Sequence, residues 1–217
     1  MTADSSFGEP HDILRVATYN IHKGVQGVGP TRRLEIHNLA LAIETLDADI
    51  VCLQEVRQGN RKEASYFTGW PEQPQAEFLA PEGYEAVYRS NAVTKHGEHG
   101  NALLSRWPVI ECRHEDMSDH RFEQRGLLHA KLLVAGVTLH AIVVHFGLIP
   151  SSRVRQTAHL KAYIAREIPL DEPVVVAGDF NDWGTRVRRL LRVDSLHAFE
   201  GPRTLTYPSR YPVAQLD

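Results

Sequence analysis

The sequence is poor in cysteine. Only Cys52 and Cys112 are present, they form no close-spaced pair, and Cys52 sits within an apolar run typical of a buried thiol. A disulfide-stapled fold and a structural zinc site are therefore not expected. His96 and His99 have the spacing of a metal pair, but no further cysteine or aspartate is arranged around them, so zinc is not expected there either.

Long apolar runs are also missing. No segment approaches the roughly 20 apolar residues of a membrane-spanning helix. The stretch from Met1 to Asp12 is polar and lacks the apolar core of a secretory signal. We expect a flexible N-terminus over residues 1–12 and a cytoplasmic protein, with peripheral membrane contact left open.

An excess of basic residues is absent, because 24 Lys and Arg face 27 Asp and Glu, for a formal net charge of −3. This argues against holding long nucleic acid by bulk electrostatics, although a local basic rim remains open. Familiar nucleophile and nucleotide motifs are missing too: there is no G-x-S-x-G elbow, and the glycines of Lys23–Gly29 lack the Walker ending. We interpret that segment as a flexible loop at the mouth of a site.

What is present is a series of short β-rich runs in one domain, residues 13–217. Two amphipathic helices are predicted, Arg32–Leu46 after a Thr31 N-cap and Ser152–Glu167 before Pro169. The proline-containing segment Glu63–Gly83 predicts a long irregular loop. The predicted strands are Ile13–Tyr19, Asp49–Gln54, Tyr84–Tyr88, Ala102–Ser105, Leu127–Val134, Val137–Val144 and Pro173–Ala177.

Polar residues follow several of these strands at their carboxyl ends, where ligands gather in sheet proteins. They are Asn20, Glu55, His145, Asp179 and Asn181. One shared site is the economical explanation.

Each of these residues also has an ordinary structural interpretation. Asp179 and Asn181 would project to the same side of an extended chain, but could equally form a turn after the strand. Glu55 could bind magnesium through oxygen, or pair with an arginine. His145 could be a hydrogen-bonded structural residue; its combination with the two acidic segments favours a catalytic site.

Taken together, the ordered motifs resemble the endonuclease/exonuclease/phosphatase superfamily, which includes pancreatic-type deoxyribonuclease. The resemblance runs from about Arg15 to Asp217. Within the superfamily, the sequence is most similar to bacterial members found beside cardiolipin synthase. This resemblance implies an α/β fold, a four-layer α/β/β/α sandwich of two mixed β-sheets with helices outside. The motifs are RVATYNIHKG, IVCLQEV, HGNALLSRWPV, QRGLLHAKL, VVHFGL, AGDFNDW and TYP…QLD.

The resemblance also implies roles for individual residues. Glu55 would be the principal ligand of Mg²⁺, or of Mn²⁺, with Asn20 beside it. Asp179 would orient or deprotonate water. Phosphate would be bound by His145, Asn181 and Arg125, and Asp217 would support the histidine or the metal.

The sequence departs from the family at its end, where a Ser-Asp-His segment beyond the position of Asp217 is expected. Ser118–His120 has these letters but lies in a polar loop, and we interpret it as coincidence. We therefore expect the last strand to be missing and the activity of this chain to be low.

The predicted function is magnesium-dependent hydrolysis of phosphodiester bonds, most simply by a nuclease. A phosphodiesterase or phosphatase acting on phospholipids or small molecules, and a non-catalytic binding module of the same fold, remain the alternatives.

Overall fold

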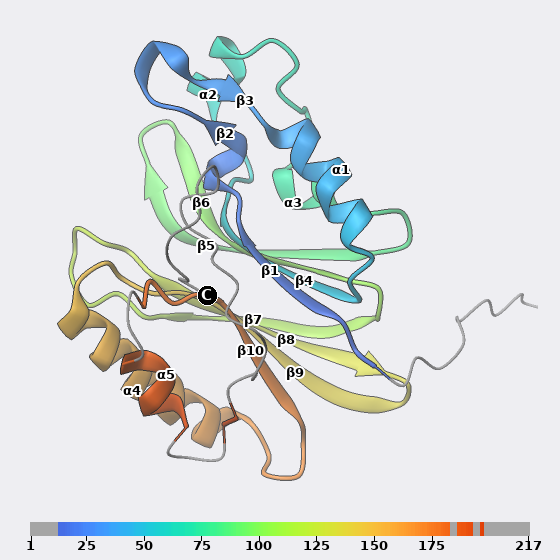
Figure 1. Ribbon diagram of the computed structural model, residues 1–217, viewed down its shortest axis with the longest axis vertical. Coiled ribbons are helices and arrows are strands. Elements are labelled where there is room, and N and C mark those ends of the chain that lie inside the picture. Colours follow the sequence, from blue (N-terminus) through green and yellow to red (C-terminus); the bar gives the residue numbers. More distant parts are fainter. Residues whose placement is uncertain (1–12, 183–185, 193–195, 198–217) are drawn as a thin grey trace, which may run out of the picture.

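The computed structural model describes residues 13–182, 186–192 and 196–197. Two four-stranded sheets of mixed direction pack face to face (Figure 1). The first sheet has the order β1 (Val16–Asn20), β4 (Ile50–Val56), β6 (Gly97–Ser105), β5 (Glu85–Thr94). The second has the order β10 (Val174–Asp179), β9 (Val137–His145), β8 (Gly126–Val134), β7 (Val109–Asp116).

Helices cover the outer face of each sheet. In Figure 1, α1 (Ile36–Leu46) and α3 (Gln75–Leu79) lie over the first sheet, while α4 (Pro150–Glu167) and α5 (Arg186–Leu191) lie over the second. The predicted four-layer α/β/β/α sandwich is confirmed. Among the described helices, none combines the length and the apolar character needed to cross a bilayer.

Alternation along β4 shows why the layers form. Ile50 and Cys52 pack into the core between the sheets, whereas Val51 and Leu53 pack under α1 and α3. A strand buried on both faces appears as a continuous apolar run, as Ile50–Leu53 does. A third core lies between the second sheet and α4, around Ile142, Val144 and Leu160.

The first helix begins later in the structure than the sequence predicts. Helix α1 starts at Ile36, and the predicted Thr31 N-cap is wrong, because Glu35 stands at that position without a side-chain cap. Residues before it are taken up by β3 (Arg33–Leu34), which pairs with β2 (Val25–Gln26). The predicted flexible loop therefore contains one strand of a small β-ribbon; the 3₁₀ turn η1 (His22–Gly24) precedes the ribbon and η2 (Gly29–Thr31) lies between its two strands.

The remaining differences concern two short helices, one edge strand and the ends of elements. The predicted irregular loop contains α3 and part of α2 (Arg61–Tyr66), whose N-cap Asn60 accepts a hydrogen bond from Glu63 N at 3.0 Å. Strand β7 was missed, because charged residues interrupt its apolar pattern. Helix α4 begins at Pro150, two residues before the predicted start, and several predicted strands extend further.

Candidate active site

Four strands end at one place between the two sheets. Strand β1 runs parallel to β4, and β9 runs parallel to β10, with Asn20 opposite Gln54 and Asp179 opposite His145 in the register. Strands β1 and β10 also contact each other across the sandwich. The polar residues at these strand ends are therefore brought together from both sheets.

Asn20 joins the two acidic residues. Its amide Nδ2 lies 3.3 Å from Glu55 Oε1 in the first sheet and 3.1 Å from Asp179 Oδ2 in the second. Its Oδ1 accepts a hydrogen bond from His22 N at 3.1 Å. One side chain thus bridges two carboxylates that lie 35 and 159 positions further along the sequence.

Glu55 points into the site because β4 is irregular there. The register with β6 shifts between Leu53 and Val56, and Glu55 has a φ of 56°, a left-handed conformation uncommon for a residue with a side chain. Its carboxylate lies 3.0 Å from Lys23 Nζ. Burial alone would raise the pKa of Glu55, but the ammonium of Lys23 outweighs it and lowers the pKa to about 2.

Asp179 and Asn181 form a turn after β10. The chain is not extended here, since Asn181 has a φ of 49° and its N–H donates to Asp179 Oδ1 at 2.9 Å. The expectation of an extended chain is wrong, and the alternative of a turn is correct. Asn181 Nδ2 donates to Phe146 O at 2.9 Å, so one of its two amide N–H groups is already engaged.

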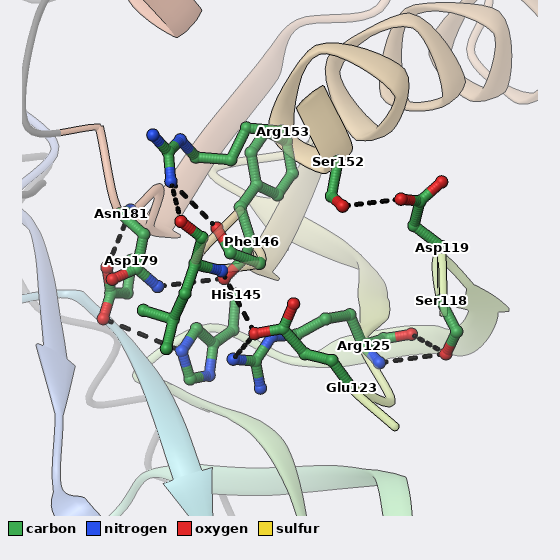
Figure 2. A network of polar contacts seen from close by, with 12 residues as sticks. Ser118, Asp119, Glu123, Arg125, His145, Phe146, Ser152, Arg153, Asp179 and Asn181 are labelled. Carbon is green, nitrogen blue, oxygen red and sulfur yellow. Dashed lines mark hydrogen bonds and ion pairs between the residues drawn. The ribbon is translucent and has the colours of Figure 1, made fainter. Parts of the chain in front are cut away.

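His145 lies next to Asp179, with its Nε2 3.8 Å from Asp179 Oδ2 (Figure 2). Its residue surface is 5% exposed. Burial, followed by the nearby charge of Arg125, lowers the pKa of His145 to about 4, against the opposing effect of Asp179 and Glu55. The imidazole is therefore neutral near pH 7 and can donate one N–H.

Arg125 approaches His145 from the start of β8 (Figure 2). Glu123 Oε1 accepts from Arg125 Nη2 at 3.0 Å and from Leu148 N at 3.1 Å. Arg125 Nε is buried, and within the described residues it finds no acceptor. A buried, unused guanidinium N–H is suited to an anion.

The Ser118–His120 loop is tied to α4. Asp119 accepts from Ser152 Oγ and from Arg155 at 2.5 Å, and His120 Nε2 lies 3.0 Å from it. In the view of Figure 2, the bond between Asp119 and Ser152 lies on the far side of Arg125 from Asp179.

Three residues that lie in or under the site are not among the predicted site residues. Lys23, in the predicted loop, contacts Glu55. His99 lies close enough to Lys23, Arg57 and Arg125 that burial and then these cations lower its pKa. Asn101 lies fully buried beneath, and its Nδ2 donates to Gly126 O and Val143 O of the opposite sheet. Lys23, His99 and Asn101 all fall within the quoted motifs, which was the available signal.

Asp217, predicted to complete the acidic set, lies outside the described residues. In the described part of the chain, no group of three or more His, Cys, Asp and Glu is arranged to enclose a metal ion. The donor set at the strand ends is instead two carboxylates and an amide.

The chain is similar to several known proteins, in sequence or in fold. The E. coli K12 protein YbhP, described as uncharacterized, is 36% identical over 212 residues, covering 94% of this chain and 83% of its own. The human Nocturnin catalytic domain with bound sulfate has a TM-score of 0.59 at 21% identity, covering 83% of this chain and 70% of that one. D. rerio TDP2 complexed with a single-strand DNA product has a TM-score of 0.54 at 18% identity, covering 82% of this chain and 64% of that one.

These solved structures share the fold with the chain, which spans about two thirds of their length. The family model described as Endonuclease/Exonuclease/phosphatase family matches residues 17–217, from β1 to the last residue of the sequence. The chain therefore belongs to the endonuclease/exonuclease/phosphatase family.

Proposed function

We propose that the chain is a magnesium-dependent hydrolase of phosphodiester bonds, and that it acts as a nuclease. The observation that carries the proposal is the junction of two carboxylates, one from each sheet, by the amide of Asn20. A neutral, buried His145 and a guanidinium with an unused N–H stand beside them. An acidic pair with adjacent anion-binding donors suits a phosphate ester and its attacking water.

The residues present fit magnesium better than zinc. Magnesium is usually held by one or two carboxylates and keeps several waters and substrate oxygens, whereas zinc is normally enclosed by cysteine and histidine. Glu55 would hold the ion, with Asn20 Oδ1 or waters that it positions completing the protein's share. When bound, the ion would neutralise charge on the phosphoryl oxygens and favour attack by water.

The chain's own residues would do the rest. Asp179, whose Oδ1 is fixed by Asn181 N, would accept a proton from the attacking water. His145 would donate its N–H to a non-bridging oxygen. Arg125 Nε and the second N–H of Asn181 would bind the same phosphate.

Nucleic acid is favoured as substrate by the surface next to Glu55. Arg57, two residues beyond it, pairs with Glu63 at 3.3 Å, and Arg32 pairs with the other oxygen at 2.7 Å. The Arg32 guanidinium lies over the rings of Tyr66 and Phe67, 5.9 and 5.3 Å from their centroids. Cations interleaved with aromatic rings are typical of surfaces that bind nucleic-acid strands. The single-strand DNA product bound by the structural neighbour TDP2 is consistent with this preference.

The first prediction concerns the metal. Glu55→Gln removes the carboxylate directed at the ion, so we expect magnesium affinity measured by calorimetry to fall at least tenfold. Hydrolysis should fall by about 10²–10⁴, the range typical of lost catalytic groups. Glu77→Gln removes an exposed carboxylate of α3 and should change neither quantity.

The substrates to compare are duplex DNA, single-stranded DNA, RNA, bis-p-nitrophenyl phosphate and phospholipid vesicles. Unchanged magnesium affinity in Glu55→Gln would defeat the metal assignment. Hydrolysis of phospholipid but of no nucleic acid would defeat the nuclease assignment and retain the phosphodiesterase.

A further inference from the structure

Lys23 occupies the carboxylate that the proposed function assigns to the metal. Its Nζ lies 3.0 Å from Glu55 Oε2, and the two side chains are 33% and 18% exposed. An ammonium and a divalent cation at one carboxylate repel each other strongly in such a partly buried place. Metal binding at Glu55 must therefore work against Lys23 or displace it.

The backbone around Lys23 is shaped to produce this contact. His22 and Lys23 have φ values of 47° and 64°, two consecutive non-glycine residues in the left-handed region. Such a conformation is unfavourable and persists only where surrounding contacts enforce it. The left-handed turn ends at the residue whose side chain reaches Glu55.

A buried glutamine holds the turn, together with backbone hydrogen bonds at Gly24. Gln75 of α3, 2% exposed, donates from Nε2 to Lys23 O at 2.8 Å and accepts at Oε1 from Arg57 N at 2.8 Å. The same side chain thus fixes the Lys23 turn and the chain just beyond Glu55. The next residue is glycine for a reason, since a Cβ on Gly24 would lie 2.7 Å from Gln75 Nε2.

We propose that Lys23 competes with the metal for Glu55 and, when the metal binds, becomes a ligand of the substrate phosphate. Without metal, Lys23 neutralises Glu55. When a divalent ion binds Glu55, Lys23 moves aside and donates to a non-bridging oxygen of the substrate phosphate. A lysine suits this exchange, because its flexible stem carries a compact charge with three donors. The inference rests on the proposed function and adds a substrate-binding residue and an order of binding to it.

The test is calorimetric titration of Mg²⁺ and of Mn²⁺ into the full chain at fixed pH and ionic strength, without substrate. Lys23→Met should bind either ion about tenfold more tightly than the wild type, because a competing charge is gone. Lys23→Arg, which keeps the charge, should stay within about threefold of the wild type. Lys62→Met, which removes an exposed lysine from α2, controls for the general loss of a positive charge.

The second measurement is the binding of inorganic phosphate at saturating Mg²⁺. We expect Lys23→Met to weaken it about tenfold and Lys62→Met to leave it unchanged. If Lys23→Met binds the metal with wild-type affinity while Glu55→Gln no longer binds it, the inference about Lys23 is overturned and the proposed function stands. Unchanged phosphate affinity would overturn the transfer to substrate. Full metal affinity in Glu55→Gln would instead overturn the proposed function.

Discussion

At the scale of single residues, the site depends on backbone conformations that most side chains avoid. Glu55, Asn181 and Gly178 all have positive φ values, 56°, 49° and 151°, at the ends of β4 and β10. Each conformation turns a side chain or the following residue into the space between the sheets. Conformations of this kind are unfavourable by about 1–3 kcal/mol for residues with a side chain, so the surrounding structure must hold them.

Gly178 is the position where this requirement is strictest. A Cβ there would overlap the carbonyl oxygen of Val144 on the paired strand β9. We expect Gly178→Ala to lower the free energy of unfolding by about 3 kcal/mol or more and to displace Asp179, so that hydrolysis also falls. Denaturant unfolding and turnover of the same preparation measure both effects.

Gly136→Ala is the matched control. Gly136 has a φ of 85° in the β8–β9 hairpin, but an added Cβ there meets nothing within 4 Å. It should show the backbone cost alone, about 1 kcal/mol, with turnover intact. Equal losses in the two variants would contradict the close approach to Val144.

At the scale of elements, the sequence predicted those strands whose burial shows as a local pattern of apolar residues. Strands β4 and β9 were found because buried strands appear as apolar runs, and Glu55 and His145 were found because a polar residue ends each run. Strand β7 was missed because Glu111, Arg113 and Glu115 interrupt its apolar pattern. An edge strand with one solvated face carries a weaker signal than a central strand.

Contacts between distant elements were beyond the sequence patterns. Gln75 bonds to Lys23, 52 residues earlier, and nothing in the segment around Gln75 marks it as more than a loop residue. The start of α1 was misplaced for a similar reason, since Arg33 and Leu34 pair with β2 instead of continuing the helix. Propensity yields to tertiary pairing in both places.

A buried pair of histidines joins β8, β9 and α4. His129 Nδ1 lies 2.9 Å from Tyr163 Oη and its Nε2 lies 2.8 Å from His140 Nδ1, while His140 Nε2 bonds to Glu172. One direction satisfies every group with neutral rings: Tyr163 donates to His129, His129 to His140, and His140 to Glu172. Protonation of His129 would remove the acceptor that Tyr163 uses.

This network predicts a loss of stability in mild acid. Burial, which disfavours the charged imidazolium, is the largest cause that lowers the pKa of His129 to about 4 in the folded protein, from 6.5. Between these values the unfolded chain binds a proton that the folded chain does not, so the free energy of unfolding falls as the pH is lowered through that window. His145, whose pKa is lowered to the same value, adds to the effect.

Denaturant unfolding at pH 7, 6 and 5 measures the slope. His129→Gln should be less stable at pH 7 but should lose less on acidification, because one of the histidines with lowered pKa is gone. His96→Gln replaces an exposed histidine in the β5–β6 turn and should keep the wild-type slope. A wild-type slope in His129→Gln would refute this account of the network.

At the scale of the whole molecule, stability depends on the core between the two sheets. Leu103 of β6 is fully buried there with Ile50, Leu128 and Val143. Leu103→Ala should lower the free energy of unfolding by about 2–5 kcal/mol, the range for a leucine removed from a close-packed core. Leu41→Ala, on α1 with 63% exposure, should cost under about 1 kcal/mol. Thermal and denaturant unfolding of both variants measure the two effects. Similar losses of unfolding free energy in both variants would contradict the claim that stability depends on the core between the sheets.

The bridge that Asn20 makes between Glu55 and Asp179 has a consequence for the order of folding. The two carboxylates belong to different sheets, so a folding intermediate in which only one sheet has formed contains half of the site. The proposed metal ligands Glu55 and Asn20 both lie in the first sheet, whereas the phosphate-binding and proton-accepting residues lie in the second, so phosphate binding at saturating Mg²⁺ would begin only when the sheets dock. The time course of phosphate binding during refolding would therefore date the moment at which the two halves of the protein meet.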